Sequence, residues 1–396
     1  MNQCSIAYIS FDTVPAPKGA AIHITAFSTA LASAFNEIQL VTVSPSGTIQ
    51  TSNNIHPHIQ QTMLPAIGNN LINRVLSFRN FLREFLAGKR WKVIQIRSIY
   101  EGFIIANNKK QYCDYLIFEV NGLPSIELKY RYPAVADDRE LIHKLYTQEQ
   151  VCLETADLII TPSSVTSAFL QNRGVDINKI KVIPNGVDLD VFTVKENYHH
   201  EDIFKLLYFG TFSSWQGVNL AIEALGLINR DFPASLTLIG QGRNAQIKTL
   251  ENLADKLGVL DKLTILEPVS QVKLVEYIHQ SDVILAPLTP NDRNLVQGCC
   301  PLKVLEAMAT GVPVISSDLP VVRDLGENGL DFLLVKPGSA KAIKDAVLLL
   351  RNNQELITTI TNNARNTIVN NYTWQKAGLD LINAYTELGI KRLITA

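Results

Sequence analysis

Short apolar runs alternate with longer amphipathic runs along nearly the whole chain. A short apolar run bounded by turn residues predicts a buried strand, and apolar residues recurring every three or four positions predict a helix. In the first half, the pattern predicts strands at residues 5–10, 39–44, 93–97, 116–120, 158–161 and 181–184, and helices at residues 20–35 and 140–155.

A second alternating series follows. It predicts strands at residues 206–210, 235–240, 263–267, 283–287 and 312–316, and helices at residues 218–229, 245–257, 271–280, from 301, 340–352, 354–370 and 374–388. Such alternation is typical of parallel sheets with helices on both faces. We therefore expect an α/β chain with two doubly wound, Rossmann-like domains, residues 1–184 and 204–373, joined by a polar linker at residues 185–203.

Length, net charge and the numbers of Cys and His argue against several classes of function. The 396 residues are too many for one typical core, and the net charge of −1 argues against a nucleic-acid partner. Five scattered cysteines and seven histidines show no metal-ligand spacing, so we expect no metal and a reducing compartment. The N-terminus lacks a basic region and a cleavage site, and no apolar run has the length of a membrane span. These features predict a cytoplasmic location.

The segment from Cys299 to Asp318 carries the strongest functional signal. It predicts a tight turn, a helix with Pro301 at its first position, and a buried strand. The first helical turn, Leu302 to Val304, presents free backbone N–H groups, and Lys303 adds a positive charge, so this end attracts anions. One turn later, Glu306 offers a carboxylate that accepts two sugar hydroxyls. This combination fits a nucleotide or a nucleotide sugar.

That pattern resembles the signature of the retaining, nucleotide-sugar-dependent glycosyltransferases of the GT-B fold (group 1, family 4), in the variant with Pro-Leu-Lys before Leu-Glu. The resemblance covers nearly the whole chain. The second Glu of the family's Glu-x7-Glu element usually binds the ribose and matches Glu306, while the first, which usually binds the hexose, falls on Gly298. The resemblance implies two domains facing a central cleft, with residues 374–396 packing back on the N-terminal domain. It also implies no required metal, no bound cofactor, and a nucleotide diphosphate sugar as co-substrate.

The loop before the first helix adds a second match. The family usually has Gly-Gly here and a His a few residues later; Lys18 and Gly19 take the two glycine positions, and His23 matches the His. The resemblance therefore places Lys18 and Gly19 beside the donor diphosphate and gives His23 a catalytic role. An ordinary strand–helix turn remains the alternative interpretation.

The loop from Phe209 to Val218 departs from the family. The family usually has an Arg after the first glycine, Gly210, and a Lys before the second; here Thr211 and Gln216 take those places. Gly210 and Gln216 keep donor-side positions, and Lys303 and Lys18 are expected to supply the missing charge. The alternative is a non-catalytic nucleotide-sugar-binding subunit.

Residues 240–245, Gly-Gln-Gly-Arg-Asn-Ala, satisfy a dinucleotide fingerprint, and Glu267 ends the next strand. Alone, this motif indicates an NAD-dependent oxidoreductase. It follows the second strand of its domain, however, and the family commonly has a Gly-x-Gly turn here. The resemblance therefore places Gly242 beside the donor and the loop containing Val269 against the nucleotide base.

Four polar residues follow strand ends in the N-terminal half: Arg97, Glu101, Glu119 and Asn121. They are candidates for the acceptor side. Glu119 resembles an acceptor-side residue of the family that orients or deprotonates the acceptor hydroxyl. Its alternative role is a salt-bridged carboxylate, and Arg97 either faces an anionic acceptor or pairs with Glu101 or Glu119.

Residues 71–92 combine an apolar stripe with six Lys or Arg and one acid, Glu84. A core-packed helix with a basic edge and a helix lying on an anionic membrane surface both fit this pattern. Membrane contact would suit a lipid-linked acceptor. Taken together, we expect a hexosyltransferase that moves a sugar to a hydroxyl of a glycan or lipid-linked acceptor in bacterial glycolipid or polysaccharide synthesis.

Overall fold

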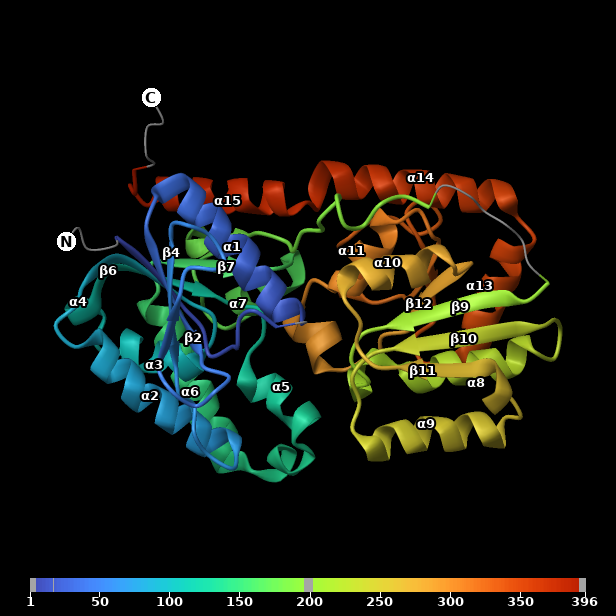
Figure 1. Ribbon diagram of the computed structural model, residues 1–396, viewed down its shortest axis with the longest axis horizontal. Helices are drawn as coiled ribbons and strands as arrows, with labels where there is room; N and C mark the ends of the chain where they lie inside the picture. The colour runs from blue at the N-terminus through green and yellow to red at the C-terminus, as the bar shows by residue number, and fades with distance from the viewer. Residues whose placement is uncertain (1–4, 17, 196–201, 392–396) are drawn as a thin grey trace. The chain divides into compact units, whose positions relative to one another are not determined.

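The computed structural model describes residues 5–16, 18–195 and 202–391. The chain divides into unit 1, residues 1–184 and 375–396, and unit 2, residues 185–374. In Figure 1, each unit contains one sheet with helices on both faces. Cys4, Pro17, residues 196–201 of the expected linker with His199 and His200, and the end of the expected C-terminal segment, residues 392–396, lie outside the described residues.

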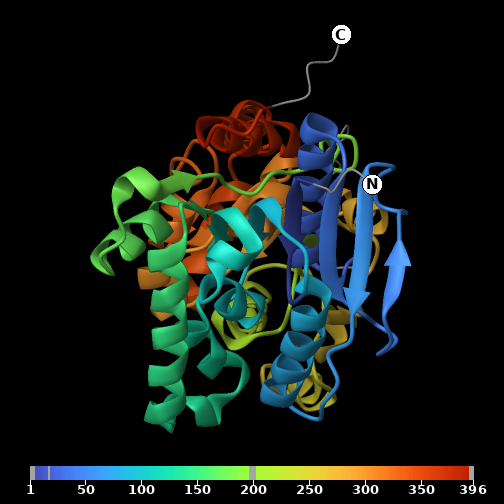
Figure 2. The same cartoon turned by 90° about the vertical axis from the view of Figure 1, so that its left-hand side faces the viewer.

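Unit 1 contains, within its described residues, an eight-stranded sheet of order β3-β4-β2-β1-β5-β6-β7-β8. Neighbouring strands are parallel except β3, which pairs antiparallel with β4 at one edge. Figure 2 shows this edge, where two blue arrows run in opposite directions. The strands are β1 (Ile6–Ile9), β2 (Ile38–Val43), β3 (Gln50–Ser52), β4 (Ile59–Leu64), β5 (Trp91–Ile96), β6 (Cys113–Glu119), β7 (Leu158–Thr161) and β8 (Ile180–Val182).

Helices cover both faces of this sheet, including α15, which returns from the end of the chain. A Cβ added at Gly378 would lie 2.9 Å from the Ala30 side chain, so α15 packs closely against α1. The helices are α1 (Gly19–Phe35), α2 (Leu71–Leu86), α3 (Ile99–Ala106), α4 (Lys109–Tyr112), α5 (Pro124–Arg131), α6 (Arg139–Thr155), α7 (Ser164–Asn172) and α15 (Trp374–Glu387), with the short 3-10 turns Pro133–Asp137 and Ile177–Lys179.

Unit 2 contains a six-stranded parallel sheet, in the part the structure describes, of order β11-β10-β9-β12-β13-β14. Its strands are β9 (Phe204–Phe209), β10 (Ala234–Ile239), β11 (Leu263–Leu266), β12 (Val283–Ala286), β13 (Val314–Ser317) and β14 (Leu333–Val335). Its helices are α8 (Val218–Ile228), α9 (Asn244–Lys256), α10 (Gln271–His279), α11 (Leu302–Ala309), α12 (Pro320–Arg323), α13 (Ala340–Arg351) and α14 (Gln354–Asn371), with 3-10 turns at Ser214–Gln216 and Leu260–Lys262 and a π-helical turn at Arg293–Gln297.

Local sequence explains many helix starts. Side chains of Asn70, Ser163, Ser270 and Ser339 each accept a backbone N–H in the first turn of the helix that follows. This capping satisfies donors that have no partner inside the helix. Apolar residues of the strands and of the helix faces then form one buried core in each unit.

The predicted fold class is confirmed: the chain is α/β with two parallel, doubly wound sheets. Several short elements were not expected, among them β3, β4, α3, α5, α7 and β14. Pro301 is the N-cap of α11 rather than its first helical residue. The basic helix ends at Leu86, and residue 91 already begins β5. Residues 185–195 of the expected linker are attached to unit 2, where Val187 bridges to Thr373.

Strand order fixes where a ligand can bind. In open α/β sheets, ligands lie outside the carboxyl ends of the strands, where the strand order reverses. In unit 1 the order reverses between β1 and β5, and in unit 2 between β9 and β12. We therefore expect a ligand site in the loops that follow these four strands.

Candidate active site

The loops after β9 and β12 contact each other at the reversal point of unit 2. Gly217 has φ +69°, and a Cβ there would overlap the carbonyl oxygen of Pro287, so only glycine fits. The backbone N–H of Thr289 donates to the carbonyl of Trp215 at 3.0 Å. The two loops thus hold each other beside the start of α11.

Lys303, in the first turn of α11, points its side chain back to β9. Its Nζ lies 4.0 Å from the centre of the Tyr208 ring, and the residue is only 8% exposed. Among the described residues, Nζ has no hydrogen-bond partner. A Cβ at Gly210 would lie 3.0 Å from Nζ, so the glycine leaves room for the amine.

A buried ammonium without a carboxylate or carbonyl partner is unfavourable. Burial lowers the pKa of Lys303 to about 7, although nearby Glu306 opposes this shift. Burial raises the pKa of Glu306 to about 7, against a hydrogen bond from Gln271 and the charge of Lys303. Both groups therefore titrate close to neutral pH, one helical turn apart. Strongly shifted groups in a helix that follows a strand-end loop are typical of a functional site.

The Gly240 turn is filled by protein. A Cβ at Gly240 would overlap the carbonyl oxygen of Gly210, and a Cβ at Gly242 would lie 2.6 Å from the Phe212 ring. These glycines let two loops of the unit pack together. The turn also follows β10 and not β9, the strand at which the order reverses. Both observations count against a dinucleotide site here.

The other expected donor-side residues differ in their exposure. Leu302 and Val269 are partly exposed, whereas the Val304 side chain is fully buried in the core. Gln216 has a buried Oε1 that, within the described residues, has no partner. Gly298 has φ +85°, a left-handed backbone that a glutamate would adopt only with strain.

At the reversal point of unit 1, Glu119 ends β6 and is 1% exposed. Side chains from two strands, one helix and two loops converge on its carboxylate, and the pairs were not evident from sequence spacing. They are Tyr8 Oη at 2.6 Å, Gln95 Nε2 at 2.7 Å, Arg97 Nε at 2.7 Å, His23 Nε2 at 2.9 Å, and Asn121 Nδ2. The structure thus brings together four residues that the sequence indicated: His23, Arg97, Glu119 and Asn121.

This network decides what Glu119 can do. Burial would raise its pKa, but His23 and Arg97 together with hydrogen bonds hold it well below its usual range. A carboxylate this saturated with donors is a poor base. Arg97 is occupied as well, because its second contact is Asp12 at 3.1 Å. Glu119 is therefore better suited to hold its neighbours in place than to accept a proton, and its pair with Arg97 is the salt bridge that the sequence offered as the alternative.

Glu101 has a structural position. It is fully buried and accepts backbone N–H groups of Arg97 at 2.8 Å and Ser98 at 2.7 Å, closing a capping box at the start of α3. Burial raises its pKa to about 7 against these bonds. The side chain thus holds the loop that presents Arg97.

Lys18 and Gly19 lie where α1 begins. Lys18 is the N-cap residue, has a half-exposed side chain, and pairs with Asp12 at 2.8 Å. Gly19 is the first residue of the helix. Together they leave a cation and the first backbone N–H groups of α1 at the reversal point of unit 1.

Comparison with known protein families is consistent with both halves of this geometry. Residues 17–191 match the model of Glycosyltransferase Family 4, and residues 192–367 match the model of Glycosyl transferases group 1. Together the two models cover residues 17–367, so the chain belongs to the glycosyltransferases. The two matched segments meet between residues 191 and 192, close to the boundary between the structural units.

Individual relatives are distant. A D-inositol 3-phosphate glycosyltransferase of Geodermatophilus obscurus is 27% identical over 271 residues, 64% of this glycosyltransferase and 57% of that protein. Sucrose-phosphate synthase from Thermosynechococcus elongatus matches with a TM-score of 0.78 at 20% identity, covering 98% and 99% of the two chains. Anabaena HepE in complex with UDP-glucose matches with a TM-score of 0.72 at 15% identity, covering 96% and 99%. The two solved structures establish the shared fold.

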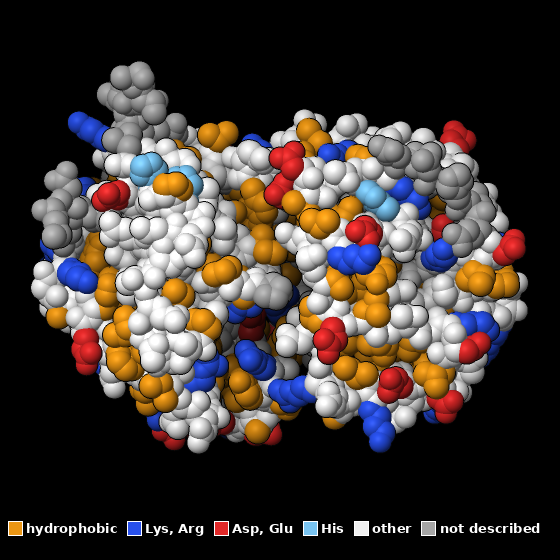
Figure 3. Space-filling view, viewed as in Figure 1, with side chains coloured by type: hydrophobic (Ala, Val, Ile, Leu, Met, Phe, Trp, Pro, Cys, Tyr) orange, Lys and Arg blue, Asp and Glu red, His pale blue; other side chains and the backbone are white. Residues whose placement is uncertain are grey.

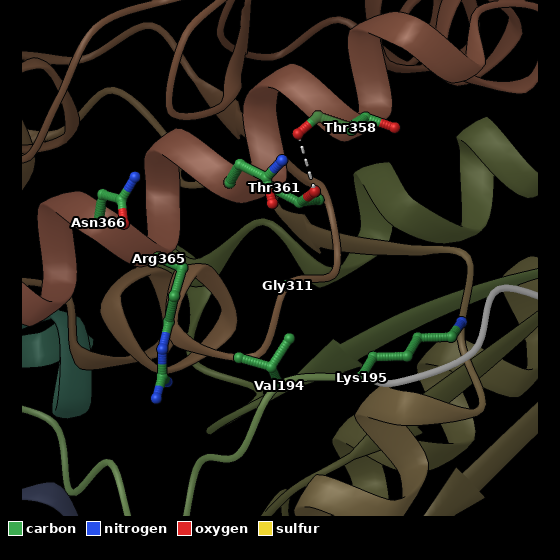
Figure 4. A pocket seen from close by; sticks show the side chains of 8 residues that line it. Val194, Lys195, Gly311, Thr358, Thr361, Arg365 and Asn366 are labelled. Atoms are coloured by element: carbon green, nitrogen blue, oxygen red, sulfur yellow. Dashed lines mark hydrogen bonds between the residues drawn. The ribbon is translucent and has the colours of Figure 1, made fainter.

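A separate hollow of about 460 Å³ in unit 2 of the glycosyltransferase does not contain the candidate residues. It is lined by α14 and by the segment that contains Val194 and Lys195 (Figure 4). Its charged groups already bond to backbone: Lys195 Nζ donates to Ser281 at 2.9 Å, and Arg365 donates to the carbonyls of Phe192 and Ala309. These bonds give both cations a structural role.

Helix α2 has an apolar face buried in unit 1 and a second, smaller exposed one. Val75, Phe78 and Leu82 are buried, while Ile72 and Leu76 are about half exposed. Within the described ranges, every helix is too short or too polar to traverse a lipid bilayer. On the face in Figure 3, Lys and Arg are interspersed with Asp and Glu over both units.

The described residues of the glycosyltransferase contain no group of three or more His, Cys, Asp or Glu side chains arranged to hold a metal ion. The four described cysteines, Cys113, Cys152, Cys299 and Cys300, are buried and form no disulfide with one another. Burial raises the pKa of Cys300 to about 12, so this thiol next to α11 stays protonated.

Proposed function

We propose that the chain transfers a sugar, with retention of configuration, from a nucleotide diphosphate sugar to a hydroxyl acceptor. One observation carries the proposal: at the reversal point of unit 2, a buried amine with no hydrogen-bond partner among the described residues lies beside a carboxylate one turn away. An anionic group is the missing partner for Lys303, and hydroxyl groups suit Glu306. The bound UDP-glucose of HepE, a protein of the same fold, supports a donor of this class.

The proposed roles follow from position. Lys303 and the first N–H groups of α11, near Leu302, bind the diphosphate, and Glu306 accepts the ribose hydroxyls. The loop at Val269 contacts the base, and Gly210 leaves room for the diphosphate to approach the amine. No resident cofactor is needed, because the donor supplies the activated sugar.

In the proposed transfer, no protein side chain is needed as a base. The acceptor oxygen forms a bond to the anomeric carbon as the bond from that carbon to the phosphate oxygen breaks, and the acceptor proton passes to that phosphate oxygen. Charge therefore grows on the leaving diphosphate, where a protonated Lys303 stabilises it. In unit 1, His23 is held by Glu119 and is proposed to contact the reacting sugar or acceptor.

The acceptor is proposed as a glycan or lipid-linked hydroxyl in bacterial glycolipid or polysaccharide synthesis. Exposed Ile72 and Leu76 on basic helix α2 support contact with an anionic membrane surface. The free cysteines support a reducing location such as the cytoplasm, including its membrane face.

A second candidate is a nucleotide-sugar-binding subunit without catalysis. Thr211 and Gln216 favour it, because neither side chain supplies a positive charge for a leaving diphosphate. The Thr211 hydroxyl instead lies 3.2 Å from that of Ser213. Transfer or donor hydrolysis by the purified chain alone would exclude this candidate.

A thermal-shift panel of UDP-, GDP- and ADP-sugars tests the proposal, because a ligand that binds only the folded state raises the melting temperature. We expect one nucleotide class to stabilise the wild type and to lose its effect in Glu306→Ala. Anomeric proton signals of the product then report retention. Stabilisation by NAD(H) with no response to any nucleotide sugar would contradict the proposal.

A further inference from the structure

A chain of buried side chains connects the C-terminal helix to His23. Tyr385 Oη, on α15, donates to Gln95 Oε1 at 2.6 Å, and Gln95 Nε2 donates to Glu119 Oε2 at 2.7 Å. The other oxygen of Glu119 lies 2.9 Å from His23 Nε2. Tyr385 and Gln95 are 0% exposed, Glu119 1% and His23 3%, so water does not replace any of these contacts.

The strand register explains why these side chains meet. Tyr8 of β1 is paired with Gln95 of β5, and Gln95 is paired with Ile117 of β6. Glu119 lies two residues beyond Ile117 and therefore projects from the same face of the sheet. α15 packs on this face, because Tyr385 reaches Gln95 and its ring centre lies 5.7 Å from that of Phe35.

Each link in the chain has a fixed direction. Burial and the charge of Glu119 raise the pKa of Tyr385 well above its usual value, so the phenol keeps its proton and donates it. Gln95 must then accept with Oε1, which turns its amide N–H groups towards Glu119. His23 faces the ionised Glu119 with Nε2 at 2.9 Å, so we expect a neutral His23 to carry its proton on Nε2, where it points to the carboxylate.

The hydroxyl of Tyr385 is not needed for packing. The other buried residues of α15 are small or apolar: Ala377, Gly378, Leu381, Ile382 and Ala384. A phenylalanine would fill the same core volume, whereas a buried hydroxyl is unfavourable unless it is bonded. The hydroxyl is therefore best explained by the direction it imposes on Gln95.

We propose that Tyr385 is a positioning residue that, through Gln95 and Glu119, sets the tautomer and orientation of His23. The importance of His23 for transfer rests on the proposed function, but the link from Tyr385 to His23 does not. In addition to packing on the sheet, α15 thus supplies the Tyr385 hydroxyl that begins the buried chain of contacts to His23.

The test compares two tyrosines, each of which loses one hydrogen bond of its phenol hydroxyl. Tyr385→Phe breaks the chain, and Tyr372→Phe, the matched control, removes a 3.0 Å bond to the backbone of Asp324 with no connection to Glu119. Nitrogen-15 spectra of histidine-labelled full-length protein read the tautomer of His23, whose signals are assigned by their loss in His23→Asn.

In the wild type and in Tyr372→Phe, we expect neutral His23 to carry its proton on Nε2. In Tyr385→Phe we expect a mixture of tautomers, and Gln95→Met should give the same mixture if Tyr385→Phe does not fold. A wild-type His23 signature in either chain-breaking variant, or the same change in Tyr372→Phe, would overturn the proposal.

Kinetics separate this inference from the proposed function. If the chain transfers sugar, Tyr385→Phe should lower kcat by about 10-fold and leave the donor KM unchanged, because misplacing a reacting group affects the transition state. An unchanged kcat in a variant with a changed His23 tautomer would remove Tyr385 from the reaction. If the wild type transfers nothing, the proposed function fails, and the spectra still decide the link between Tyr385 and His23.

Discussion

The amine of Lys303 lies 4.0 Å above the centre of the Tyr208 ring, held between the start of α11 and the end of β9. An aromatic face attracts a cation weakly, but it does not replace a hydrogen bond. The pair therefore keeps the amine in place while leaving its N–H groups available to a ligand. The amine is therefore already in position to bind an anion before a ligand enters the site.

Lys303→Met should stabilise the folded chain by about 1–3 kcal/mol at pH 7, because it removes a buried amine that has no hydrogen-bond partner in the described part of the chain. The folded pKa is about 7, below the unfolded value of 10.5. The penalty is therefore complete below pH 7 and declines as the pH rises from 7 towards 10.5. Urea unfolding at pH 6 and pH 10 should show a larger gain at pH 6. A loss of stability at both pH values would contradict the proposed state of Lys303.

Donor affinity should be highest near pH 7. Lys303 must be protonated to bind the diphosphate, so affinity falls as the pH rises above its pKa of about 7. Glu306 must be ionised to accept two hydroxyls, so affinity falls as the pH drops below its pKa of about 7. Calorimetric titration of the nucleotide sugar found in the thermal-shift panel measures both limbs. Lys303→Met should remove the alkaline limb and Glu306→Gln the acid limb; an unaltered profile in both variants would exclude these groups.

Gly210→Ala should weaken donor binding. The backbone there has φ +127°, so an alanine costs about 1–3 kcal/mol of folding free energy, and its methyl group would push the Lys303 amine aside. Gly338→Ala is the control, because Gly338 also has a positive φ but open space around it. Both variants should lose stability, whereas only Gly210→Ala should raise the donor dissociation constant. Equal donor affinities would show that Gly210 has no role beside the amine.

Glu119→Gln should destabilise the chain by about 3–5 kcal/mol, because Arg97 would lose its nearest buried counter-charge and an amide NH2 would face other donors. Asp114→Asn removes a carboxylate of similar type from the half-exposed pairs with Arg90 and Lys92, where little change is expected. Urea unfolding of both variants provides the comparison. A similar loss of stability in the two variants would mean that the buried pairs of Glu119 stabilise the chain no more than the half-exposed pairs of Asp114.

The pattern of apolar residues predicted most of the fold because parallel strands are buried on both faces and their helices are amphipathic. It missed elements whose stability comes from neighbours, such as β3, an edge strand of three residues, and β14. The predicted start of α11 was one residue too early, because proline is also compatible with the cap position.

The candidate site was predicted less evenly. Lys303 and Glu306 could be found because charge at a helix start has a direct chemical meaning. Tyr208, Tyr8 and Gln95 were missed, although a polar group inside an apolar strand is itself a signal of a buried partner. The role of Glu101 was also readable, since Ser98 and Glu101 form the S-x-x-E spacing of a capping box. Which carboxylate receives which donor depends on strand register, which spacing alone does not give.

The central claim is that Lys303 binds the donor diphosphate. Calorimetric titration of UDP, GDP and ADP into the wild type, Lys303→Met and the exposed control Lys341→Met tests it most directly. We predict that at least one diphosphate binds the wild type and Lys341→Met equally, and that Lys303→Met binds it about 30- to 150-fold more weakly, equivalent to the loss of about 2–3 kcal/mol from one charge-assisted contact. Equal affinity in the wild type and Lys303→Met would contradict the account.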